Sequence, residues 1–237
     1  MRLLIFTIHN TDATYNKKKS GHFKMDFNIF LKSISKIKNL ELPGEVSQIK
    51  MSPPYRLELM ERNKVLMKSA KQAAVLSLFY PNKNNETHLI LILRKTYKGV
   101  HSAQVGFPGG KVEHSDRNLQ TTALRETHEE VGVPEHQVQV LKQMTPMYIP
   151  PSNFTVHPFF GVSESTPDFI KQDEEVEGLI EVALSHFLDD ASVISTSVKT
   201  SYKIDVQVPA FKLNDHVVWG ATAMMLSEVK DLLKKVL

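Results

Sequence analysis

The hydrophobic positions near the N-terminus recur with a helical period. From Asp26 the chain reads DFNIFLKSISKIKNL, with apolar side chains at spacings of three and four residues, which predicts an amphipathic helix. A second short helix is predicted over residues 57–66, and the proline- and glycine-containing residues 40–55 are predicted to be a connection. Residues 1–24 show no clear periodicity, so we predict a poorly ordered extension followed by a helical segment over residues 25–69.

From residue 72 the pattern becomes that of β-strands. The apolar runs AAVLSLFY and THLILILR flank the polar turn PNKNNE and predict a hairpin or a neighbouring pair of strands. The remaining predictions are strands at 104–107, 137–148 and 154–162, a loop or short helix at 173–179, a helical turn at 184–188, β structure at 192–213 and a final helix at 222–237. Helices that flank a mixed sheet form an α/β sandwich, which we predict as one domain over residues 70–237.

The candidate chemistry lies between Phe107 and Val133. This stretch opens with Gly109 and Gly110 and continues into a helical pattern that ends at Gly132, a natural helix stop. Within the helix, one side carries Glu126, Glu129 and Glu130, whereas another side is suited to packing inward. Three carboxylates are therefore predicted to converge after a glycine bend.

Carboxylates at these spacings repel one another, by a few tenths of a kcal/mol per pair. Arg125 can reach Glu129 one turn further on, but one cation does not neutralise three acids, whereas a divalent ion with oxygen ligands does. The alternative is a solvated helix face without chemistry. The upstream glycine bend favours a site, because successive backbone N–H groups in such a bend form an anion-binding concavity.

This stretch resembles the signature of the Nudix hydrolases, in which a glycine loop and an R-E-x-x-E-E-x-G helix bind the divalent metal that cleaves a diphosphate. The matching residues are Arg125, Glu126, Glu129, Glu130 and Gly132. The common pattern has an acid followed by seven residues before the Arg-Glu pair, but here Asp116 takes that place with eight residues following. This departure resembles the subgroup that hydrolyses coenzyme A.

An upstream stretch extends the resemblance to the coenzyme A subgroup, whose pattern is R-S-x-x-L-x-x-H-x-G-Q-[VI]-x-F-P-G-G. This chain reads RKTYKGVHSAQVGFPGG, where Lys95, Lys98 and Ala103 depart from the usual Ser, Leu and Gly. The upstream stretch, which selects the substrate in this subgroup, thus matches the subgroup's pattern less completely than the catalytic stretch does. Later segments from Met147 and Val208 also look like this subgroup, so the resemblance covers about residues 70–237.

The resemblance implies roles for named residues. The implied metal ligands are Glu126, Glu129 and Glu130, with Mg²⁺ or Mn²⁺ as the ion, and the catalytic set adds Arg125 and, from the acidic QDEEVEG segment, Glu175. For Arg125 we favour orientation of the helix through Glu129, and for Glu175 the alternative is a solvated acidic loop. The implied substrate-binding residues are Arg94, His101, Gln104, Gly109, Gly110 and Lys111. Trp219 is predicted to pack in the core.

The composition limits the kinds of metal site and of partner that the chain can have. The chain has no cysteine, so a metal site has no thiolate ligand and a hard ion is favoured. The formal net charge of +3 is small, and the longest purely aliphatic run, Leu89 to Leu93, is far shorter than the ~20 residues that span a bilayer. We predict a cytoplasmic protein with a small-molecule substrate and no nucleic-acid or membrane partner; the oligomeric state stays open, a homodimer included.

The activity implied by the resemblance is hydrolysis of coenzyme A or acyl-CoA to 3′,5′-ADP and a 4′-phosphopantetheine compound. An alternative enzyme activity is cleavage of another nucleoside diphosphate derivative, such as ADP-ribose or a dinucleotide. A third alternative is a non-catalytic ligand sensor, against which the intact Glu126, Glu129 and Glu130 argue.

Overall fold

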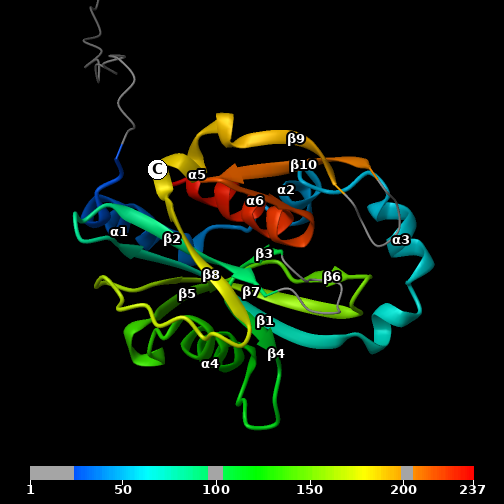
Figure 1. The fold of residues 1–237 in the computed structure, drawn as a ribbon, viewed down its shortest axis with the longest axis horizontal. Coiled ribbons are helices and arrows are strands. Elements are labelled where there is room, and N and C mark those ends of the chain that lie inside the picture. The colour runs from blue at the N-terminus through cyan, green and yellow to red at the C-terminus, as the bar shows by residue number, and fades with distance from the viewer. Residues whose placement is uncertain (1–23, 96–103, 199–204) are drawn as a thin grey trace, which may run out of the picture.

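The computed structural model describes residues 24–95, 104–198 and 205–237 (Figure 1). Its strands are β1 (Lys71–Pro81), β2 (Thr87–Arg94), β3 (Val105–Gly106), β4 (Gly109–Lys111), β5 (Gln139–Gln143), β6 (Met147–Ile149), β7 (Phe154–Val162), β8 (Val176–Ala183), β9 (Val193–Val198), β10 (Val206–Leu213) and β11 (His216–Trp219). Its α-helices are α1 (Phe27–Ile34), α2 (Glu45–Ile49), α3 (Arg56–Arg62), α4 (Leu119–Val131), α5 (Leu184–Leu188) and α6 (Gly220–Lys234). Among these residues, no helix is both long and apolar enough to cross a bilayer.

The central sheet is mixed. Its strands follow the order β3-β2-β1-β7-β5, and β4, β6 and β8 pair with β1, β7 and β2. Strands β1 and β7 run parallel, from Lys71 beside Phe154 to Phe79 beside Val162, while the other pairs are antiparallel. A separate antiparallel sheet has the order β11-β10-β9.

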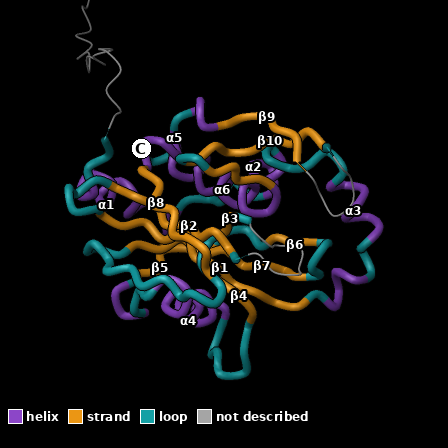
Figure 2. The backbone as a smooth tube through the Cα atoms, viewed as in Figure 1, coloured by secondary structure: helices purple, strands orange, loops and turns teal. Residues whose placement is uncertain are grey.

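The alternation of side chains along β1 builds a core on each face of the central sheet. Ala74, Leu76, Leu78 and Tyr80 point to the face that packs against Ala123 and Val131 of α4. The intervening Phe79 points to the other face, where its ring lies 5.4 Å from that of Phe30 in α1 and 4.9 Å from that of Phe160. Apolar residues of α6 belong to the same core, so α4 lies on one side of the sheet and α6 on the other (Figures 1 and 2). The predicted α/β sandwich with a mixed sheet is confirmed.

The N-terminal helical segment is more structured than its sequence suggested. Asp26 caps α1 by accepting hydrogen bonds from the backbone N–H groups of Asn28 and Ile29, at 2.9 and 3.1 Å. The prediction that residues 40–55 form only a connection was wrong, because they contain α2, which packs against α6. This contact includes Gln48, which donates to the buried Glu228 carboxylate of α6 at 3.0 Å.

Several strands begin or end at other residues than the sequence predicted. Residues 137–148 do not form one strand, because β5 ends at Gln143 and β6 begins at Met147. Between them, the Thr145 hydroxyl donates to Glu228 Oε1 at 2.6 Å. Residues 173–179 were predicted as a loop or short helix, but strand β8 begins at Val176. Val176 packs in the core on the α4 face of the sheet, and Ile180 packs in the core on the opposite face. Strands β4 and β11 were not predicted; both are too short to show a period-two pattern.

Candidate active site

Helix α4 has clear signals at both ends. The Asn118 side chain accepts a hydrogen bond from the Thr121 backbone N–H at 2.9 Å, which caps the N-terminus. At the C-terminus Gly132 adopts the left-handed conformation with φ of 78°, which glycine tolerates best. These signals fix which residues are helical, and therefore which side of α4 carries its glutamates.

The glycine bend seats two of these glutamates. The Gly109 N–H donates to Glu130 Oε2 at 2.8 Å. A Cβ on Gly110 would lie only 2.4 Å from the Glu126 carboxylate oxygens, so this carboxylate occupies the space that any other residue would need. A Cβ on Gly109 would lie 2.4 Å from the Ala74 carbonyl oxygen, and its φ is +147°. The predicted juxtaposition of the bend with Glu126 and Glu130 is therefore present. That the bend cradles a phosphate stays a prediction, since the Gly109 N–H is bonded to Glu130.

Glu130 does not lie on a solvated helix face. Its side chain is 4% exposed, and its Oε1 is buried without a hydrogen-bond partner within the described residues. Its ion-pair partner is the Arg94 guanidinium, whose Nη1 lies 3.5 Å from Oε1. Burial raises the pKa of Glu130 to about 7, against the opposing effects of Arg94 and the Gly109 N–H. The ionised carboxylate would thus gain from a further positive charge.

Glu126 and Glu129 have different surroundings. The Glu126 side chain is 15% exposed, and burial raises its pKa despite the neighbouring Arg125 guanidinium. The Glu129 side chain is 54% exposed and is paired with Arg125 Nη1 at 2.9 Å. Two of the three predicted ligands therefore lie against the glycine bend, and the third lies at the surface.

Arg125 ties α4 to the loop that precedes it. Its Nε donates to Asp116 Oδ1 at 2.9 Å, and its Nη2 donates to Asp116 Oδ2 at 3.1 Å and to the Lys111 carbonyl at 3.0 Å. Asp116 also accepts from the Thr122 hydroxyl at 2.8 Å, and the hydrogen bonds from Arg125 hold its pKa well below the usual range. The predicted contact of Arg125 with Glu129 exists, but Asp116 is the more extensive partner. Asp116 thus fixes Arg125, a role that the departure in spacing alone did not indicate.

A small cavity of about 260 Å³ is lined by Glu126, Glu129, Glu130, Gln172 and Glu175. Glu175 is 59% exposed, and its Oε2 lies 3.9 Å from Arg94 Nη2, so the structure brings this distant residue to the predicted ligands. The sequence did not indicate Gln172, whose Oε1 accepts a hydrogen bond from the Glu175 N–H at 2.7 Å.

The residues of this small cavity can be compared with a metal site. Among the described residues, no three aspartate, glutamate or histidine side chains already lie close enough together to coordinate one metal ion. The donor set is nevertheless all oxygen, and the unpartnered Glu130 Oε1 supplies an open acceptor, so these residues fit a hard divalent ion.

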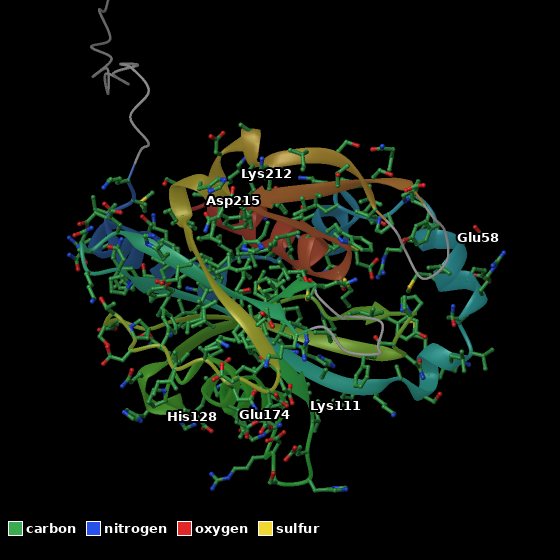
Figure 3. The ribbon with its side chains drawn as sticks, in the orientation of Figure 1. Glu58, Lys111, His128, Glu174, Lys212 and Asp215 are labelled. Carbon is green, nitrogen blue, oxygen red and sulfur yellow. The ribbon has the colours of Figure 1, made fainter. Side chains whose placement is uncertain are left out.

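A larger cavity of about 830 Å³ is lined by both glycines of the bend, Gly109 and Gly110. Of the predicted substrate-binding residues, Arg94, Gln104, Gly109, Gly110 and Lys111 line it, whereas His101 lies outside the described residues. Since Arg94 also contacts Glu130 and Glu175, it stands between the two cavities. Figure 3 shows Lys111 and Glu174 toward the same edge of the molecule as His128 of α4.

Trp219 and Arg56 line the large cavity, although the sequence did not predict a cavity position for either. Trp219 was expected in the core but is half-buried and lines the cavity, at the end of β11 where α6 begins. Arg56 comes from α3, far away in the sequence, and its Nη2 donates to the Tyr148 carbonyl at 3.0 Å. No periodicity or motif near Arg56 could have indicated this position.

Comparison with known proteins gives one consistent family. Residues 70–195 match the model of the NUDIX domain. The chain is 34% identical over 141 residues to a protein of Yersinia pestis (strain Pestoides F) named "Uncharacterized Nudix hydrolase NudL", in an alignment that covers 60% of this chain and 70% of the relative. The same name, identity and coverage apply to a protein of Yersinia pseudotuberculosis serotype O:1b (strain IP 31758).

Solved structures are less similar. A Nudix hydrolase from M. smegmatis, RenU, is 15% identical with a TM-score of 0.46, covering 71% of this chain and 88% of that one. An Ap4A hydrolase of C. elegans in a binary complex is 14% identical with a TM-score of 0.47, covering 70% of this chain and 98% of that one. Similarity at this level carries no argument about substrate.

Proposed function

Because this chain belongs to the Nudix hydrolase family, whose members act on phosphoric anhydride bonds, we propose that it hydrolyses the diphosphate of coenzyme A or acyl-CoA with Mg²⁺ or Mn²⁺. Water adds to one phosphorus, the P–O–P bridge breaks, and the products are 3′,5′-ADP and 4′-phosphopantetheine or its acyl derivative. The observation that carries the hydrolase assignment is the seating of Glu126 and Glu130 against the Gly109–Gly110 bend.

The residues that would hold the ion are Glu126 and Glu130, with Glu129, Glu175 and Gln172 around the same small cavity. When bound, a divalent ion neutralises developing charge on phosphoryl oxygens and lowers the pKa of water. The protein's own contribution is orientation. The Gly109 N–H fixes one oxygen of Glu130, which leaves the other available, and Arg125 fixes Glu129 through an ion pair.

Arg94 lies between the small cavity, which the glutamates line, and the large cavity. Its guanidinium lies within 3.5 Å of Glu130 and 3.9 Å of Glu175, and the side chain also lines the large cavity. A planar guanidinium with several donors can engage a phosphate oxygen while keeping a carboxylate partner. We therefore place the diphosphate of the substrate at Arg94, with the remainder of the substrate in the large cavity.

The lining of the large cavity supports an extended, anionic substrate that also has apolar parts. Among the described residues that line it, the charged side chains are those of Arg56, Arg94 and Lys111, and none is an aspartate or glutamate. Apolar side chains such as Leu59 and Met225 fill much of the remaining wall. Coenzyme A carries phosphates, an adenine ring and a long pantetheine arm, and this chemistry matches the lining better than that of a small sugar phosphate.

A substrate panel tests the proposal. Purified full-length protein with Mg²⁺ is incubated with CoA, acetyl-CoA, ADP-ribose and a dinucleoside polyphosphate, and the products are identified by mass spectrometry. We expect the highest kcat/KM for CoA or acetyl-CoA, with 3′,5′-ADP as a product. A preference for ADP-ribose or the dinucleotide refutes the CoA assignment, and binding without hydrolysis of any substrate indicates a sensor. Glu130→Gln prepared in parallel controls for contaminating phosphatases.

A further inference from the structure

The large cavity has a wall that the family match does not include. Residues 70–195 match the NUDIX domain, whereas Pro53, Tyr55, Arg56 and Leu59 come from the helical segment before it. Arg56 is the first residue of α3 and is half-buried. Any ligand that fills this part of the cavity therefore meets a cation that the family's own motif does not provide.

The charge of Arg56 is only partly compensated. Its Nη2 donates to the Tyr148 carbonyl at 3.0 Å, and in the described part of the chain no carboxylate lies within ion-pairing distance of it. Burial lowers the pKa of Arg56, while the more distant Glu45 acts in the opposite direction. A guanidinium has five N–H donors, so Arg56 retains donors for an anion inside the cavity. Since a half-buried charge without an ionic partner is costly, a bound anion would stabilise it.

Neighbouring arginines do not share these surroundings. Arg62, at the other end of α3, pairs with Glu58, and both side chains are largely exposed, at 70% and 55%. Glu58 lies at the outer edge of the molecule in Figure 3. Arg94 lines the same cavity as Arg56 but is already paired with Glu130 and Glu175. Helix α3 thus turns one arginine toward the cavity and another toward solvent.

The two arginines that line the large cavity belong to different elements, β2 and α3. Arg94 adjoins the small cavity beside α4, whereas Arg56 contacts β6 and belongs to α3, which lies on a different side of the molecule from α4 (Figure 1). We propose that Arg56 binds a phosphate monoester of the substrate that is separate from the diphosphate held at Arg94. The inference rests on the proposed function, under which this group is the 3′-phosphate of coenzyme A.

A binding measurement tests the inference without metal or turnover. The full-length wild type, Arg56→Gln and the control Arg62→Gln are titrated by calorimetry with 3′,5′-ADP and with 5′-AMP, which lacks the 3′-phosphate. A lost charge-assisted contact is worth roughly 10- to 100-fold in affinity. We expect the wild type and Arg62→Gln to prefer 3′,5′-ADP by about this factor, and Arg56→Gln to lose the preference. Equal affinity of the wild type for the two nucleotides, or equal weakening of both by Arg56→Gln, overturns the inference.

Kinetics with CoA and dephospho-CoA separate the inference from the proposed function. Arg56→Gln is expected to lower kcat/KM for CoA by roughly 10- to 100-fold more than for dephospho-CoA, and Arg56→Lys, which keeps the charge, to recover part of this difference. Failure of the wild type to cleave CoA refutes the proposed function, and the calorimetry then decides on Arg56 alone. If the wild type cleaves CoA and the ratio between the two substrates is unchanged in Arg56→Gln, only the role of Arg56 is refuted.

Discussion

Substitution of Gly110 by alanine perturbs the site through one defined contact. The new Cβ would lie 2.4 Å from the Glu126 carboxylate. Ordinary contact between these atoms needs about 3.4 Å or more, so the carboxylate must move by roughly 1 Å. Gly110 does not have a positive φ, and the group that must move is the far end of a flexible side chain, so the backbone can remain in place.

The expected result is a folded protein with a misplaced ligand. A displacement of this size costs about 100-fold in turnover, whereas the free energy of unfolding changes by about 1 kcal/mol or less because Glu126 can adopt another rotamer. Mn²⁺ affinity, measured by electron paramagnetic resonance without substrate, is expected to fall as well. This second readout separates a metal defect from an effect on the large cavity, which Gly110 also lines.

Two other glycines provide the comparison. Gly106 lines the same cavity, and a Cβ there would meet nothing within 4 Å, so Gly106→Ala is expected to keep wild-type Mn²⁺ affinity. A Cβ on Gly109 meets the Ala74 backbone oxygen, so Gly109→Ala is expected to lower the free energy of unfolding by about 2–4 kcal/mol in urea denaturation. Wild-type turnover and Mn²⁺ affinity in Gly110→Ala would refute the reasoning, because the position of Glu126 would then not matter.

Three further changes test the remaining roles. Glu130→Gln is expected to reduce kcat by about 100-fold or more while circular dichroism stays that of the wild type, because a ligand charge is lost and the amide keeps the shape; unchanged kcat would place the metal elsewhere. Arg94→Ala is expected to raise KM about 10-fold without weakening Mn²⁺ binding, since it removes a competing cation beside Glu130; weaker Mn²⁺ binding would contradict this. Asp116→Asn is expected to lower the free energy of unfolding at pH 7 by about 2–3 kcal/mol in urea denaturation, because it breaks a buried ion pair with Arg125. The pKa of Asp116 is held low in the folded state, so as the pH falls below about 4 the unfolded chain takes up this proton first and the stabilisation declines; the variant should lack this part of the acid dependence, and an identical pH profile would contradict the assignment.

The parts of the site that are local in sequence could be predicted from it. The caps of α4 and the spacing of Glu126, Glu129 and Glu130 depend on neighbouring residues only, so the pattern indicated which side chains share a side of the helix. The pattern did not reveal that Glu129 is largely exposed while Glu130 is buried, because burial depends on the strands packed against α4.

The parts that depend on distant packing were not predictable. Trp219 was expected in the core, since nothing in the sequence shows that its strand ends beside a cavity. Arg56 lies in a segment that could be interpreted only as a short helix, and its contact with Tyr148 joins two regions far apart in the chain. The extents predicted for the N-terminal extension, the helical segment and the catalytic domain stay predictions, as does a cytoplasmic location.

We propose that the glycine bend and the acidic side of α4, which lie against each other, together hold a divalent cation beside the large cavity. The most direct measurement is anomalous X-ray scattering from crystals of the full-length protein grown with Mn²⁺. We expect an anomalous peak in contact with Glu126 and Glu130. A peak at another position, with those two carboxylates unliganded in a catalytically active protein, would contradict it.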